Sequence, residues 1–164
     1  MRNKLLSLAS LSLLIGLLTS CAITPDFDTT KVDQALTPKS VVAESSLSHG
    51  KIVLWGGTII EIHNLKNSTQ IEVLAYPLNS SHRPMQESQP LGRFIIQNKG
   101  YLEPSNYAQG RLLTVLGSVS KSQSGKVGES SYIYPVINAQ QLHLWSLNDD
   151  QNNTSFHFGI GIRL

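Results

Sequence analysis

Short segments rich in β-branched and aromatic residues, separated by glycine and polar turns, follow one another from His49 onward. Such segments, with period-two alternation and almost no helical periodicity, predict an all-β domain. Gly56-Gly57 interrupts the first of them, and glycine within a strand indicates a bulge or a sharp bend. The bent first strand and a connector between the third and fourth strands favour a small Greek-key barrel of OB-like type with five to seven strands. A β-sandwich is the alternative.

The expected strands differ in pattern. Residues 112–119 form the strongest candidate, and residues 69–75 alternate as in a half-buried strand. The other candidates are residues 52–55, 58–62, 93–96, 132–137 and 141–145. Residues 122–128 are expected to form a Gly/Ser turn, and residues 41–43 a short edge segment.

Residues 148–164 combine a polar break with an amphipathic C-terminal strand. The apolar residues of this strand share one face; they are Phe156, Phe158, Ile160, Ile162 and Leu164. The favoured role is to close the barrel or cover one of its edges. The alternative is that the apolar face lies against lipid or that the strand pairs with a strand of a partner.

The first twenty residues have the three-part pattern of a secretory signal. Arg2 and Lys4 precede an uncharged, leucine-rich run over residues 5–18. A run of this length is short for a membrane-spanning helix, which needs roughly 20 residues. Residues 1–20 are therefore predicted to be a signal peptide that is removed from the mature protein.

The residues Leu18-Thr19-Ser20-Cys21 resemble the lipobox of bacterial lipoproteins. The resemblance implies a diacylglyceryl thioether on the Cys21 sulfur, cleavage before Cys21 and an acyl chain on the new N-terminus. No other cofactor is expected. Cys21 is the only cysteine, so no disulfide can brace the domain. Ala22 replaces the aspartate that tends to retain lipoproteins at the inner membrane, which points to anchoring in outer membrane lipid, at the periplasmic face.

The mature chain divides into a tether and a β domain. Residues 21–48 are predicted to be the lipidated N-terminus and tether, and residues 49–147 the β domain. The full chain has 13 Lys and Arg and 11 Asp and Glu residues; the signal peptide holds Arg2, Lys4 and no acid. The remainder therefore has no net charge. This argues against nucleic acid as a partner, because phosphate binding requires a local surplus of basic residues.

Several motifs occur in the order found in one family. Val53-Leu54-Trp55-Gly56-Gly57-Thr58-Ile59 resembles that family's V-x-W-G-G-x-I segment. Gly100-Tyr101-Leu102-Glu103-Pro104 with Tyr107 is similar to its G-F-L-D-P-x-x-Y segment. Further similar segments are residues 69–78, 92–94, 110–117, 134–136 and 144–145. On these motifs the chain resembles the Slp family of outer membrane lipoproteins, named for a starvation-inducible member. The resemblance implies an outer membrane location and an envelope role, and it brings no catalytic residue, cofactor or substrate.

Two arginines are candidate binding residues. Arg93 and Arg111 each follow a glycine at the start of an expected strand. If both lie on one rim of the barrel, their guanidinium groups could bind a carboxylate or a phosphate together. Tyr101 and Tyr107 could extend this rim as a contact surface. The favoured interpretation of the arginines is simpler, with solvated side chains at strand starts, and core packing is the competing role for the tyrosines.

The sequence shows no pattern typical of catalysis or metal binding. The five His residues have no paired ligand spacing, and no Ser lies in a G-x-S-x-G motif. We therefore expect no metal and no enzyme, but a binding role in envelope maintenance or stress protection. One alternative is an accessory subunit that docks on an envelope protein partner through the last strand or the Tyr/Arg rim. The other is a hydrolase with an unobvious site.

Overall fold

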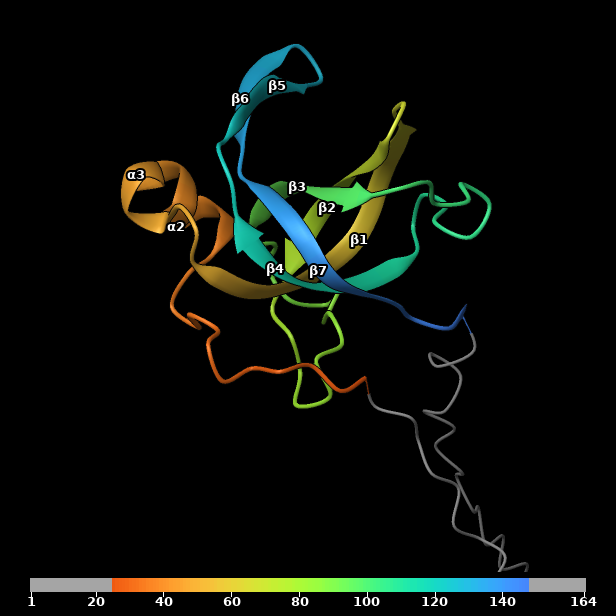
Figure 1. The fold of residues 1–164 in the computed structure, drawn as a ribbon, viewed down its shortest axis with the longest axis horizontal. Coiled ribbons are helices and arrows are strands. Elements are labelled where there is room, and N and C mark those ends of the chain that lie inside the picture. The colour runs from red at the N-terminus through yellow and green to blue at the C-terminus, as the bar shows by residue number, and fades with distance from the viewer. Residues whose placement is uncertain (1–24, 148–164) are drawn as a thin grey trace, which may run out of the picture.

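β-strands dominate residues 25–147, the part of the chain that the computed structural model describes (Figure 1). Two short helices, α2 (Pro38–Ala43) and α3 (Ser45–Ser48), precede the strands. The strands are β1 (Ile52–Asn64), β2 (Ser68–Tyr76), β3 (Gly92–Lys99), β4 (Leu112–Val119), β5 (Gln123–Val127), β6 (Ser130–Tyr134) and β7 (Val136–Leu144). The predicted all-β class is confirmed.

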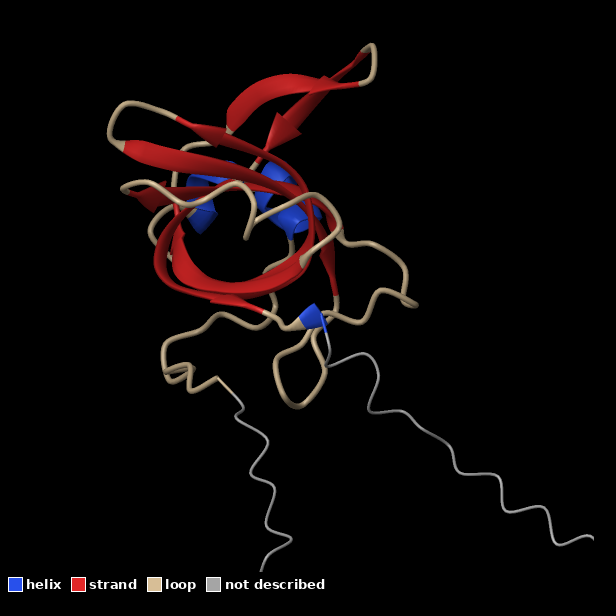
Figure 2. Cartoon of the chain, turned by 90° about the vertical axis from the view of Figure 1, so that its right-hand side faces the viewer, coloured by secondary structure: helices blue, strands red, loops and turns tan. Residues whose placement is uncertain are grey.

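Five of these strands form a closed barrel in the order β1-β2-β3-β7-β4, and β4 returns to β1 (Figure 2). All neighbouring pairs are antiparallel except β3 and β7, which run parallel with Ile95 opposite Val136. A five-stranded ring of this kind is a Greek-key barrel of OB type. The predicted barrel is therefore confirmed, and the β-sandwich alternative is wrong.

Strand β1 pairs with both β2 and β4, and Gly56-Gly57 lies where it contacts both. A Cβ at Gly56 would lie 2.7 Å from the carbonyl oxygen of Leu113 on β4. A Cβ at Gly57 would overlap the carbonyl oxygen of Leu74 on β2. The two glycines therefore let three strands approach closely at one level of the barrel wall.

Apolar side chains from all five barrel strands fill the interior. Trp55 and Phe94 meet edge to face in this core, with ring centroids 5.3 Å apart. Val41 of α2 is 1% exposed and belongs to the same cluster, so the helix is part of the core. The other fully enclosed members are Val53, Ile59, Ile71, Val73, Ala75, Ile96, Leu113, Val115, Val119 and Ile137.

Residues 41–43, expected as an edge segment, form part of helix α2 instead. The Thr37 hydroxyl accepts a hydrogen bond from the Ser40 backbone N–H (3.2 Å), and the Ser40 hydroxyl accepts one from the Thr37 N–H (2.9 Å). This capping box, with Pro38 in the first turn, starts a helix despite the weak helix propensity of the two valines.

Strands β5 and β6 form a hairpin outside the barrel (Figure 1). The expected turn over residues 122–128 is wrong, because most of it is β5. The Tyr134 ring lies over β5: a Cβ at Gly125 would be 2.9 Å from its Cε2, and its hydroxyl donates to the Lys126 carbonyl (2.9 Å). The strand expected over residues 132–137 divides at Pro135, where the chain leaves the hairpin and enters β7.

The N-terminal segment, residues 25–37, packs against the barrel although it was predicted to be part of a tether. Phe27 is 5% exposed, and the Asp33 backbone N–H donates to the Ile52 carbonyl (2.8 Å). The described chain begins and finishes on one side of the barrel, and the β5–β6 hairpin projects on the opposite side (Figures 1 and 2). Within residues 25–147, no helix is long and apolar enough to cross a membrane. The predicted strand over residues 156–164 lies outside the described residues.

Candidate functional site

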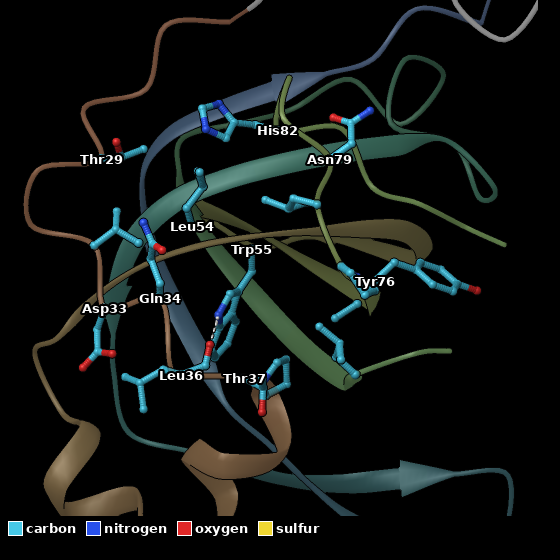
Figure 3. Close-up of a pocket in the computed structure, with 16 residues that line it drawn as sticks. Thr29, Asp33, Gln34, Leu36, Thr37, Leu54, Trp55, Tyr76, Asn79 and His82 are labelled. Carbon is cyan, nitrogen blue, oxygen red and sulfur yellow. Dashed lines mark hydrogen bonds between the residues drawn. The ribbon is translucent and has the colours of Figure 1, made fainter. Parts of the chain in front are cut away.

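A cavity of about 370 Å³ lies between the N-terminal segment and the barrel (Figure 3). Its apolar wall includes Leu36, Leu54, Trp55, Leu78 and Leu91. Its polar lining includes Thr29, Asp33, Gln34, Asn79 and His82. A volume of this size is within the range of small-molecule sites, which combine an apolar lining with a few polar groups.

Hydrogen bonds from β1 and from the residue before it fix the N-terminal segment over the cavity. The Trp55 indole Nε1–H donates to the Leu36 carbonyl (2.9 Å), as Figure 3 shows. The Lys51 ammonium donates to the Asp33 carboxylate (2.9 Å). This hydrogen bond is the main cause that lowers the pKa of Asp33, so the carboxylate is charged at neutral pH. One wall of the cavity therefore carries a negative charge that is already paired.

His82 lies on the cavity wall in a left-handed backbone conformation, with φ of 63°. Its carbonyl accepts a hydrogen bond from the Thr114 hydroxyl (2.7 Å), which in turn accepts one from the Trp145 indole (3.0 Å). Its ring meets Phe27 edge to face, with centroids 5.7 Å apart. Its Nδ1 is buried and has no hydrogen-bond partner among the described residues.

The structure does not bring the two predicted arginines together. β3 is parallel to β7 and β7 is antiparallel to β4, so β3 and β4 run in opposite directions and start at opposite ends of the barrel. Arg93 bonds the Glu72 carboxylate, with Nη1 and Oε1 2.6 Å apart. Arg111 donates to the carbonyls of Asn106 (3.0 Å) and Trp145 (2.8 Å). The less favoured alternative, an arginine pair on one rim, is therefore wrong, and each guanidinium instead bonds groups near the start of its own strand.

The two tyrosines of the predicted rim lie in the connector between β3 and β4. Tyr101 is 66% exposed, and its hydroxyl donates to the Glu103 carboxylate (3.2 Å). Tyr107 packs against the main core, and burial raises its pKa. Tyr101 is exposed whereas Tyr107 is partly buried against the core, so core packing describes Tyr107 and not Tyr101.

Sequence reasoning missed the cavity because the N-terminal segment was assigned to a tether. Its apolar residues Phe27 and Leu36 were the available signal, since a tether needs neither. The predicted lipidation residue Cys21 and sorting residue Ala22 lie outside the described residues. Among residues 25–147, no three His, Cys, Asp or Glu side chains are grouped so that they could hold a metal ion.

Several known proteins are similar to this chain. An uncharacterized protein of Haemophilus influenzae is 40% identical over 101 residues, which is 61% of this chain and 55% of the relative. The outer membrane protein Slp of Escherichia coli K12 is 31% identical over 119 residues, which is 71% of this chain and 63% of the relative. The uncharacterized lipoprotein YeaY of the same strain is 28% identical over 107 residues, 65% of this chain and 55% of the relative. Each match spans less than two thirds of the relative's own length.

A solved structure, the small single-stranded DNA-binding protein from Streptomyces coelicolor, aligns with 61% of this chain and 97% of its own at 14% sequence identity and a TM-score of 0.38. Similarity at this level says nothing about ligands. The model of the outer membrane lipoprotein Slp family matches residues 18–160. Because this match covers most of the sequence, the chain belongs to the outer membrane lipoprotein Slp family.

Proposed function

We propose that this outer membrane lipoprotein is a non-catalytic binding protein at the periplasmic face, held by acyl chains on Cys21. Its role would be envelope maintenance or stress protection through binding of a small amphipathic molecule. The observation that carries the binding role is the cavity of about 370 Å³ between the N-terminal segment and the barrel. Membership of the lipoprotein family supports the anchor.

The lining of the cavity supports an amphipathic ligand rather than a purely polar one. Leu54, Leu78 and Leu91 offer contacts for a hydrocarbon part, and the indole of Trp55 is immobilised by its hydrogen bond to Leu36. The amide side chains of Gln34 and Asn79, which line the cavity, offer hydrogen bonds to a polar group. A site with fixed walls loses little conformational entropy on binding, which favours affinity.

A photoreactive fatty acid tests this proposal in native outer membranes. Irradiation is expected to label peptides that line the cavity, from residues 29–38 and 75–82, and mass spectrometry of the purified chain would locate the label. Leu54→Trp places a larger side chain in the cavity and is expected to reduce labelling about tenfold, which corresponds to about 1.4 kcal/mol of binding free energy.

The matched control is Leu65→Trp. Leu65 is 51% exposed and lies between β1 and β2, away from the cavity lining. This variant is expected to label like the unmodified chain. Labelling spread evenly over the surface, or equal labelling of the two variants when both fold, would contradict a binding role for the cavity.

The β5–β6 hairpin favours a second candidate function, as an accessory subunit of an envelope complex. Among the described residues, β5 and β6 pair only with each other, and Ile133 is 51% exposed. Strands with free edges can pair with a strand of another protein. A photoreactive residue at position 133 should then crosslink one partner in intact envelopes, whereas the same residue at position 65 should not. Equal crosslinking at both positions would argue against this role.

A further inference from the structure

The molecule has one end, at the side of the barrel, where the described chain both begins and finishes. This attachment end consists of residues 25–30, 79–84 and 145–147, which contact one another. Phe27 meets His82, the guanidinium of Arg83 lies 5.3 Å from the Trp145 ring centroid, and Thr114 joins the Trp145 indole to the His82 carbonyl. The attachment end is therefore one connected surface built from three segments.

The covalent chain limits how far this end can lie from the anchor. Cys21 precedes Pro25 by four residues, and even a fully extended chain spans at most about 3.6 Å per residue, or about 14 Å here. The chain joins the barrel directly after that. The Gln141 side chain donates to the Asp26 carbonyl (2.8 Å), and Phe27 is 5% exposed. The tether is thus only a few residues long.

We infer that the attachment end faces the outer membrane surface and touches its lipid headgroups, with the β5–β6 hairpin pointing away from the bilayer. The inference rests on the lipid anchor of the proposed function and is independent of ligand binding in the cavity. Its basis is the short span from Cys21 to the docked Phe27, together with the position of the hairpin on the opposite side of the barrel (Figures 1 and 2).

The chemistry of the attachment end places it at headgroup depth. Asp26 and Asp28 are exposed. Hydrogen bonds from the Thr30 hydroxyl and backbone lower the pKa of Asp28, so this carboxylate is charged at neutral pH. Charged carboxylates do not enter the hydrocarbon core without compensation. Leu147, 67% exposed, is the one large apolar side chain exposed among residues 25–30, 79–84 and 145–147. The surface therefore suits contact with headgroups and not deep insertion.

The cavity reaches the same end of the molecule. Thr29, Asn79 and His82 belong both to the attachment end and to the cavity lining. In the inferred orientation, a ligand from the bilayer reaches the cavity between the N-terminal segment and the loop that follows β2. Partners in the periplasm meet the hairpin instead.

Fluorescence quenching in vesicles of phosphatidylethanolamine and phosphatidylglycerol tests the orientation. Full-length lipoprotein carrying Ser80→Cys on the attachment end, or Glu129→Cys at the hairpin tip, is labelled with a fluorophore at the new thiol. Both positions are exposed. Nitroxide-labelled headgroups are expected to quench the fluorophore at position 80 strongly and the one at position 129 several-fold less. Equal or reversed quenching would overturn the inference.

A lengthened tether tests whether the short span between Cys21 and the barrel sets the orientation. Twenty Gly/Ser residues inserted between Thr24 and Pro25 add about 25 Å of root-mean-square reach. Quenching at position 80 is expected to fall toward that at position 129; quenching that does not fall would show that the short span does not set the orientation. Mass spectrometry of each preparation separates the possible failures. An unmodified Cys21 would overturn both the anchor and the orientation, whereas a lipidated chain with reversed quenching would overturn the orientation alone.

Discussion

At Gly57 the barrel wall has no room for a side chain, because a Cβ would overlap the Leu74 carbonyl oxygen. Gly57→Ala is expected to lower the free energy of unfolding by about 3 kcal/mol, the upper part of the range for overpacked sites. The matched control is Gly100→Ala. That glycine has φ of +81° and open space around its Cα, so only backbone strain of about 1 kcal/mol is expected. Urea unfolding measures the free energy of unfolding of both variants. A larger decrease for Gly100→Ala than for Gly57→Ala would contradict the close approach of β1 and β2.

Tyr134, the last residue of β6, is 3% exposed, and its burial makes the stability of the fold depend on pH in the alkaline range. Burial, and secondly the charge of Glu72, raise its pKa above the ordinary 10.0. The folded state therefore favours the protonated phenol. This contribution to stability is complete below the unfolded pKa and is lost as the pH rises through the folded pKa. The free energy of unfolding should fall above pH 10, and less steeply in Tyr134→Phe; urea titrations from pH 9 to 11 that show equal slopes would contradict this.

Whole elements differ in how well the sequence predicts them. β2 was predictable because alternation of Ile71, Val73 and Ala75 matches the side-chain period of a strand, and all three are buried. α2 was not, because its capping hydrogen bonds and the burial of Val41 outweigh local propensity. The cavity could not be predicted, since its walls come from residues 29–38, β1 and the region after β2, which only the folded chain brings together.

The N-terminal segment should open without unfolding of the barrel. Trp55→Phe removes the indole hydrogen bond to the Leu36 carbonyl and leaves most of the aromatic volume in the core. Limited proteolysis is expected to cut residues 29–37 faster in this variant, with a loss of global stability of about 1 kcal/mol. Ile59→Val, a core change on the same strand that leaves the indole hydrogen bond in place, serves as control. Equal cleavage rates in Trp55→Phe and the unmodified chain would show that the hydrogen bond does not hold the segment.

The whole barrel closes through its weakest pairing. β3 and β7 share three opposed residue pairs, whereas β1 and β2 share eight. Amide hydrogen exchange measured by mass spectrometry should therefore be faster for the amides that join β3 to β7, including Ile95 N–H to the Pro135 carbonyl, than for those between β1 and β2. Slower exchange at the β3–β7 pairing would mean that the barrel opens elsewhere first.

That closure also matters for a protein confined to a surface. Lipid-anchored molecules diffuse in two dimensions and collide at high local concentration. Under these conditions an open sheet could pair its edge strand with that of a neighbouring molecule. A sealed ring offers no such edge along the barrel wall. Crowding can then bring these barrels side by side at the membrane surface without edge-to-edge pairing of their walls.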